Sequence, residues 1–134
     1  MTTELFYLTL TALLAASLWI PYIVGTNMVV SDPGPDFIRP PDLRERPEWV
    51  HRAHRAHLNL LEQFVPFAAL ILIAHTLNIQ SAIIAWCAAI FFWLRVAHAV
   101  GMISGLTQFP VRPIIFSAGY IAILVIGFVV MTSG

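Results

Sequence analysis

A polar stripe lies within residues 51–62, whose sequence is HRAHRAHLNLLE. At about 100° per residue in an α-helix, four of these polar residues fall within an arc of roughly 80°; they are Arg52, Arg55, Asn59 and Glu62. The stripe leads into residues 64–74, which are almost wholly apolar and suggest a membrane span. Arginine at the centre of a membrane helix costs about 2.5–3.5 kcal/mol, so it usually faces a bundle interior or a water-filled cavity. The stripe is therefore a candidate functional site.

A second polar pair, Arg95 and His98, shares one face of another expected helix. If Glu62 and Arg95 lie on antiparallel spans, they can reach similar depths, and we expect a buried ion pair between them. Together with Arg112, these arginines offer several fixed cations around neutral Asn59 and anionic Glu62. Such a pocket suits a small polyanion with one amine, because guanidinium groups bind carboxylates bidentately and a carboxylate binds an ammonium.

These residues also have structural explanations. Arg52 and Arg55 lie near an expected membrane boundary, where arginine side chains extend to lipid headgroups and act as anchors. Glu62 and Arg95 are flanked by apolar sequence, so their pairing could serve helix packing alone. The residue types leave both explanations open beside a ligand-binding role.

Other chemistries find little support. The histidines at positions 51, 54 and 57 spread over about 120° of a helix, so we expect no metal site there. No HExxH, GxSxG or phosphate-loop motif is present, which leaves hydrolase and nucleotide chemistry unsupported. The net charge is zero and the chain contains no lysine, which argues against nucleic-acid binding. Cys87 is the only cysteine, so no internal disulfide can form.

The composition is that of a membrane protein. The 134 residues are 59% hydrophobic and 10% charged, with a mean hydropathy of +0.82, whereas soluble domains carry about 25% charged residues. About 20 apolar residues suffice to cross a bilayer. We expect one all-α domain over residues 1–134, a bundle of four transmembrane helices at about 5–30, 48–77, 82–104 and 114–131.

Prolines and arginines predict the connections and the orientation. Residues 31–47 contain five of the nine prolines, which predicts a connecting loop, or alternatively a lid that folds back. Pro21 could kink the first helix, and Pro66 should kink the second without breaking it. Arginines cluster in or beside this loop and recur at Arg112 in the third connection. The first and third connections should therefore be cytoplasmic, with both termini on the opposite side.

The segment RAHRAHLNLLE at residues 52–62, the RVAH cluster at 95–98 and Pro-Val-Arg at 110–112 resemble the MAPEG family, the membrane-associated proteins in eicosanoid and glutathione metabolism. The resemblance covers essentially the whole chain and extends to microsomal glutathione transferase and prostaglandin E synthase. It implies a homotrimer that binds glutathione between neighbouring subunits near the cytoplasmic face. By motif position, the glutathione-binding residues would be Arg52, Arg55, Asn59, Glu62, Arg95 and His98.

The resemblance also implies an activity. It suggests a glutathione transferase or peroxidase that detoxifies lipophilic electrophiles or lipid hydroperoxides entering from the bilayer. Arg112 matches the arginine proposed in some members to activate the glutathione thiol. A thiol with a pKa near 8.5 is only a few per cent ionised at pH 7, and lowering that pKa by two units requires about 2.7 kcal/mol. One guanidinium in a low-dielectric site could supply this stabilisation.

The chain departs from the family pattern at several places. Met102 stands where catalytic members commonly have a tyrosine, Pro113 replaces a serine of prostaglandin E synthase-like members, and Phe116 replaces a further tyrosine. Asn27 and Met28 occupy the place of a basic residue at the end of the first helix. The lost hydroxyls favour an alternative, a non-catalytic scaffold or lipid-binding protein that keeps its polar pairs for packing. A transport path enclosed by a trimer is a third hypothesis.

Overall fold

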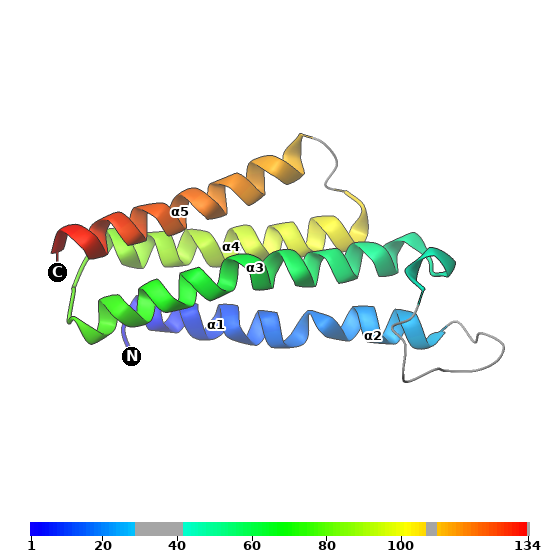
Figure 1. Cartoon of the computed structure of the whole chain (residues 1–134), viewed down its shortest axis with the longest axis horizontal. Helices are drawn as coiled ribbons and strands as arrows, with labels where there is room; N and C mark the ends of the chain where they lie inside the picture. Colours follow the sequence, from blue (N-terminus) through cyan, green and yellow to red (C-terminus); the bar gives the residue numbers. More distant parts are fainter. Residues whose placement is uncertain (29–41, 107–109, 134) are drawn as a thin grey trace.

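The computed structural model describes residues 1–28, 42–106 and 110–133. In these residues the helices are α1 (Thr3–Ser17), α2 (Trp19–Met28), the short 3-10 helix η1 (Leu43–Glu45), α3 (Glu48–Thr76), α4 (Ala82–Ser104) and α5 (Val111–Ser133) (Figure 1). Four segments are long and apolar enough to cross a membrane, one of them formed by α1 and α2 together. The prediction of an all-α bundle with four membrane-spanning helices is therefore confirmed.

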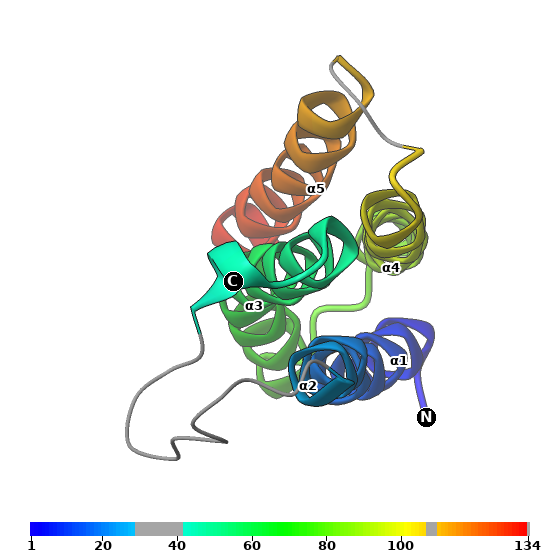
Figure 2. The same ribbon diagram turned by 90° about the vertical axis from the view of Figure 1, so that its right-hand side faces the viewer.

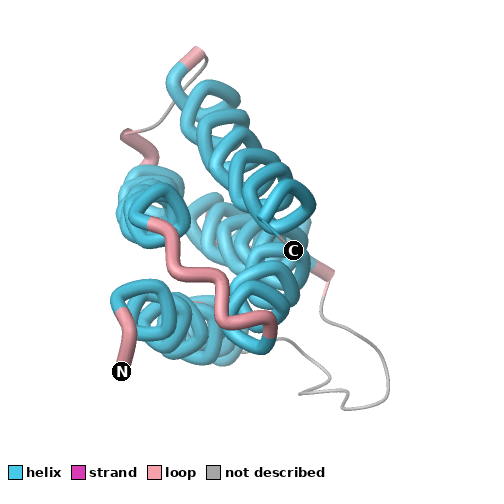
Figure 3. The backbone as a smooth tube through the Cα atoms, turned by 90° about the vertical axis from the view of Figure 1, so that its left-hand side faces the viewer, coloured by secondary structure: helices cyan, strands magenta, loops and turns pink. Residues whose placement is uncertain are grey.

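The spans lie side by side along the long axis of the molecule (Figure 1). The first span and α4 run in one direction, while α3 and α5 run in the other, so the two termini lie at the same end. The end-on views place α3 and α4 between the first span and α5 (Figures 2 and 3). The beginning of α3, the end of α4 and the beginning of α5 therefore meet at the end opposite the termini.

The first span is interrupted between α1 and α2, because Pro21 cannot form one of the regular helix hydrogen bonds. A proline lacks the N–H that would bond to the carbonyl four residues earlier, and its ring clashes with that carbonyl. That earlier residue is Ser17, where α1 ends, and α2 begins at Trp19. The expected kink is thus a short break between two helices. Residues 29 and 30 of the expected first helix, and 31–41 of the expected loop, lie outside the described residues.

The other prolines are accommodated within helices. The α3 helix runs unbroken through Pro66 and bends near its middle (Figure 1), as the sequence predicted. The α5 helix begins at Val111, three residues earlier than expected. Pro113 therefore lies in its first turn, where a missing N–H costs little because these groups have no partner within the helix.

Aromatic and branched side chains form the core between α3, α4 and α5. The rings of Phe67 and Phe91 stack with centroids 4.2 Å apart, and Ile71, Ile84 and Ile126 pack around them. Many apolar side chains point outward instead, including Trp86 and Phe128, which are 70% and 64% exposed. Lipid tails can cover such side chains, so the outward faces agree with the bilayer as the surrounding medium.

The close packing of α2 on α3 at Gly25 generates a stability prediction. A Cβ at Gly25 would lie 2.5 Å from Val50 Cγ2 and 2.7 Å from Trp49 Cη2. Overpacking of this kind costs about 1–3 kcal/mol, so Gly25→Ala should lower the free energy of unfolding in detergent by that amount. Gly127→Ala is the control, because its Cβ would meet only Leu70 side-chain atoms at 3.6 and 3.9 Å. Equal stability of the two variants would contradict the packing described.

Candidate functional site

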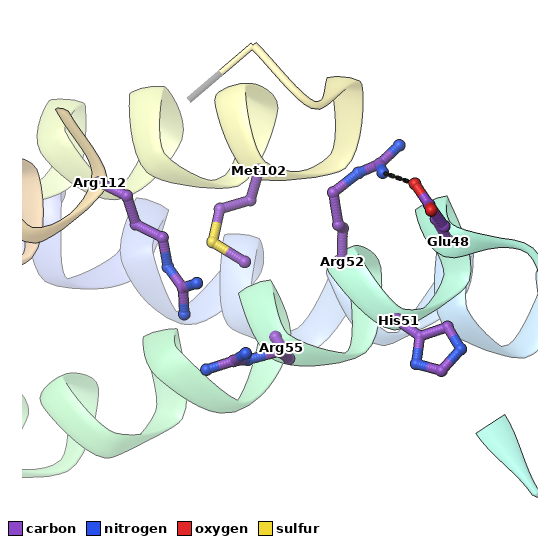
Figure 4. A pocket seen from close by; sticks show the side chains of 6 residues that line it. All are labelled: Glu48, His51, Arg52, Arg55, Met102 and Arg112. Atoms are coloured by element: carbon purple, nitrogen blue, oxygen red, sulfur yellow. Dashed lines mark hydrogen bonds and ion pairs between the residues drawn. The ribbon is translucent and has the colours of Figure 1, made fainter. Parts of the chain in front are cut away.

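An open pocket of about 400 Å³ lies where α3 begins, α4 ends and α5 begins (Figure 4). This volume falls within the range of roughly 300–1,000 Å³ that is typical of small-molecule sites. Three helices supply its lining, which consists of Glu48, His51, Arg52, Arg55, Met102 and Arg112. Three of these side chains are arginines and one is a carboxylate, so the pocket favours an anionic ligand.

Arg52 is held across the end of α4. Its Nη1 donates to Glu48 Oε2 at 3.4 Å, and its Nε donates to the carbonyl oxygen of Ile103 at 3.4 Å. Both contacts are long, and the carboxylate is exposed, so an ion pair of this kind contributes only about 0–1 kcal/mol to stability. The contacts orient the guanidinium more than they stabilise the fold.

Arg55 and Arg112 point into the pocket from α3 and α5 (Figure 4). Neither forms a hydrogen bond or an ion pair with another residue in the part of the chain that the structure describes. The two guanidinium groups are close enough to repel each other electrostatically. An anionic group placed between them would relieve this repulsion and could receive charge-assisted hydrogen bonds from both.

Met102 forms the apolar part of the pocket wall. Its side chain points into the pocket (Figure 4) and is only 4% exposed. His98 lies one turn earlier on α4, is buried, and interacts electrostatically with Arg95 and Arg112. The thioether of Met102 offers no strong hydrogen-bond donor to a ligand.

Arg95 lies seven residues before Met102 on α4, is buried, and does not line the pocket. Its Nη2 donates to the carbonyl oxygen of Ile115 at 3.1 Å. Its guanidinium also lies 5.4 Å from the ring centroid of Phe91 and 5.6 Å from that of Phe116, within the range of cation–π contacts. Phe116, the second departure from tyrosine, therefore packs against this buried cation and lies outside the pocket lining.

The expected ion pair between Glu62 and Arg95 does not form in the protomer. The Glu62 side chain is exposed, and the next residue, Gln63, is buried and faces α5. Gln63 Nε2 donates to the carbonyl oxygen of Phe116 at 3.1 Å. Successive residues of a helix differ in direction by about 100°, so only one of Glu62 and Gln63 can face the interior.

The structure thus places some of the predicted site residues in the pocket lining and others outside it. It brings together Arg52, Arg55 and Arg112 in the pocket lining, and it buries Arg95 and His98 outside that lining. Half-buried Asn59 and exposed Glu62 continue the stripe along α3, beyond the pocket lining. Three further residues of this region were not predicted as site residues from the sequence: Glu48 and His51 of the pocket lining, and buried Gln63. The signal for Gln63 was present, because it is a neutral polar residue at the start of an apolar run.

The histidines of α3 are separated by their surroundings. His51 lines the pocket, His54 packs against Tyr22 of α2 with ring centroids 4.5 Å apart, and His57 is half-buried. Among residues 1–28, 42–106 and 110–133, no group of three His, Cys, Asp or Glu side chains could hold a metal ion.

Sequence comparison identifies one family. The model described as the MAPEG family matches residues 5–132, nearly the whole chain. No curated protein matches the chain by sequence.

The separation of Glu62 from Arg95 can be tested with a double-mutant cycle. Residues that do not interact usually show additive effects within about 0.3–0.5 kcal/mol, so Glu62→Gln and Arg95→Met should be additive in the free energy of unfolding. Breaking a buried ion pair costs about 3–5 kcal/mol. A coupling energy of that size would show that the carboxylate reaches the guanidinium.

Proposed function

Because this chain belongs to the MAPEG family, a membrane family with glutathione-related members, we propose that it binds glutathione and transfers it to lipophilic electrophiles or uses it to reduce lipid hydroperoxides. The observation that carries the proposal is the pocket in which Arg52, Arg55 and Arg112 converge. The proposal assigns binding to the cations of α3 and thiol activation to the cation of α5.

The groups of glutathione match the pocket in charge. Glutathione carries carboxylates at its two ends, an ammonium and a thiol. Arg52 and Arg55 offer guanidinium groups for the carboxylates, and Glu48 offers a carboxylate for the ammonium. Arg112 stands on a different helix and would stabilise the thiolate. The thiol proton leaves to water, because the pocket is open to solvent.

In the transferase reaction, the thiolate attacks an electrophilic carbon of the second substrate. A carbon–sulfur bond forms and the leaving group departs with the electron pair of its bond. In the peroxidase reaction, two thiols are oxidised to a disulfide while the O–O bond is reduced to an alcohol and water. Exposed Val111 and Ile114 flank Arg112, so a lipophilic substrate could approach the thiolate from the membrane lipids.

A homotrimer would complete the site. Arg55 and Glu62 are exposed on a membrane-spanning helix of the protomer, and exposed charge within a bilayer is costly. A neighbouring subunit that covers this face of α3 would remove the charges from lipid. It would also place Asn59 and Glu62 at a seam beside the pocket, where they could contact glutathione as the motif implies.

The arginine distribution supports an orientation for the protein. Arg44, Arg46, Arg52, Arg55 and Arg112 gather at the end of the bundle that carries the pocket, and the termini lie at the other end (Figure 1). By the positive-inside rule, the pocket end faces the cytoplasm. The glutathione site would then open to the cytoplasm.

A non-catalytic scaffold or lipid-binding protein is the second candidate. Met102 brings no hydroxyl into the pocket, and Phe116 packs on Arg95 instead of facing a ligand. Buried Arg95 makes contacts that serve helix packing. Titration calorimetry with glutathione separates the candidates, because a scaffold should give no saturable heat at millimolar concentrations.

Arg112→Ala tests thiol activation. At pH 7 we expect the rate of conjugation to a chlorinated nitrobenzene to fall by up to roughly 25-fold, because a thiol pKa that returns from about 6.5 to about 8.5 lowers the thiolate fraction from about three quarters to about 3%. The deficit should shrink as the pH rises above the ordinary thiol pKa of about 8.5, because glutathione then ionises unaided. Arg44→Ala, at an exposed arginine of η1, is the control. Equal rates for wild type and Arg112→Ala at pH 7 would refute the role given to Arg112.

Met102→Tyr tests the missing hydroxyl. A hydrogen bond to a charged group is worth about 1.5–3 kcal/mol, so a tyrosine hydroxyl directed at the thiolate should raise the conjugation rate by roughly tenfold. Met102→Phe supplies a ring of the same shape without the hydroxyl. If both variants change the rate equally, a hydroxyl at this position does not assist the thiolate.

A further inference from the structure

The first turns of α5 lie farther from α4 than its last turns do (Figure 1). Figure 1 shows α5 close to α4 at its C-terminal end and diverging from it toward Val111. Arg112 is the second residue of α5, so its position depends on what holds this diverging end. Two side chains from two other helices reach across to it.

Both side chains bind carbonyl oxygens one turn beyond Arg112. Gln63 of α3 donates to the carbonyl oxygen of Phe116 at 3.1 Å, and Arg95 of α4 donates to that of Ile115 at 3.1 Å. Gln63 and Arg95 are 5% and 1% exposed, so water does not compete for these bonds in the protomer. We call this pair of contacts the α5 tie.

Gly119 makes room for the α5 tie. A Cβ at this position would lie 2.6 Å from Arg95 Nη2 and 2.8 Å from Gln63 Oε1. Any larger residue must therefore displace the two groups that hold the helix. The absence of a side chain at Gly119 lets α5 approach both polar heads closely.

We propose that Gln63 is a positioning residue: with Arg95 it fixes the first turns of α5 against α3 and α4 and so sets the direction in which the Arg112 guanidinium points. The inference rests on the proposed function of Arg112 in thiol activation. It adds Gln63, a residue that neither lines the pocket nor touches the reacting atoms.

Gln63 is better suited to this role than its neighbour Glu62. The amide can donate to a carbonyl oxygen, whereas an ionised carboxylate can only accept. An ionised carboxylate at position 63 would leave the carbonyl of Phe116 without this donor. The amide therefore links α3 to the backbone of α5 directly, independently of Arg95.

Loss of the α5 tie should affect activation of the thiol and spare the binding of glutathione. Arg52 and Arg55 stand on α3, which the tie does not move, whereas Arg112 stands on the helix that the tie holds. Loss of the tie should therefore displace the activating cation while the carboxylate-binding cations stay in place. A displacement of about 1 Å can cost as much as a hundredfold in rate.

The experiment compares Gln63→Met and Gly119→Ala in the purified full-length protein in detergent. Methionine keeps the length of glutamine but has no N–H donor, and alanine at 119 displaces both polar heads. We expect faster amide hydrogen exchange in residues 111–119 of both variants. In conjugation assays we expect kcat to fall by roughly tenfold to a hundredfold, while the calorimetric Kd for glutathione stays within about threefold.

Two variants provide matched controls. Thr11→Val replaces another buried polar side chain, whose Oγ1 bonds to the carbonyl of Tyr7 within α1. Gly127→Ala adds the same methyl group to α5 at a position where only Leu70 is near. Both should keep the wild-type exchange pattern and kcat.

The outcomes are distinct. Unchanged exchange in Gln63→Met, with a wild type that binds glutathione, overturns the positioning role alone. A parallel loss of kcat and glutathione affinity also overturns it, because a general loss of structure would affect both. A wild type without saturable glutathione binding overturns the proposed function and, with it, the positioning role. Selective loss of kcat together with faster exchange in α5 supports the inference.

Discussion

A guanidinium buried between membrane-spanning helices is the constraint on which this structure depends. Arg95 is 1% exposed and has no carboxylate partner within the described residues. A buried charge requires compensation, and here the compensation comes from the carbonyl of Ile115 and from the aromatic rings of Phe91 and Phe116. These partners belong to α4 and α5, so satisfying the charge requires α5 to lie where it does. At Gly119 a side chain would not fit beside Arg95 and Gln63.

This constraint gives Phe116 a different environment from that of Met102. At position 116 the phenylalanine ring packs against the buried cation of Arg95. Gln63 supplies a polar contact in this region, because its amide donates to the backbone carbonyl of Phe116. Met102 differs, because it lies in the pocket wall and its thioether leaves the ligand-facing surface apolar. Of the two positions, only 102 can alter the chemistry of the pocket directly.

Sequence alone predicted the fold well because hydropathy and helix length are local properties. The α4 helix, Ala82–Ser104, has the expected bounds, and Pro66 bends α3 as proline within a membrane helix should. The break at Leu18 and the early start of α5 were missed. Both depend on where a proline lies within a helix, because a proline in the first turn costs little whereas a proline further along removes a backbone hydrogen bond.

The site was harder to predict, because it depends on how helices rotate against one another. The spacing of Arg52 and Arg55 placed them on one face of α3, and Arg112 joins them only because α3, α4 and α5 meet at one end. Glu62 and Gln63 differ in direction by about 100° around the helix axis. Hydrophobic periodicity does not predict which of them faces the interior, because both are polar. Packing resolves it: only an amide can donate to the carbonyl of Phe116 while leaving the ionised carboxylate outside the protomer core. The same rotation leaves Glu62 exposed on the outer face of α3, where a charge within a bilayer is costly. The burial of Gln63 and the exposure of Glu62 therefore both follow from the orientation of one helix.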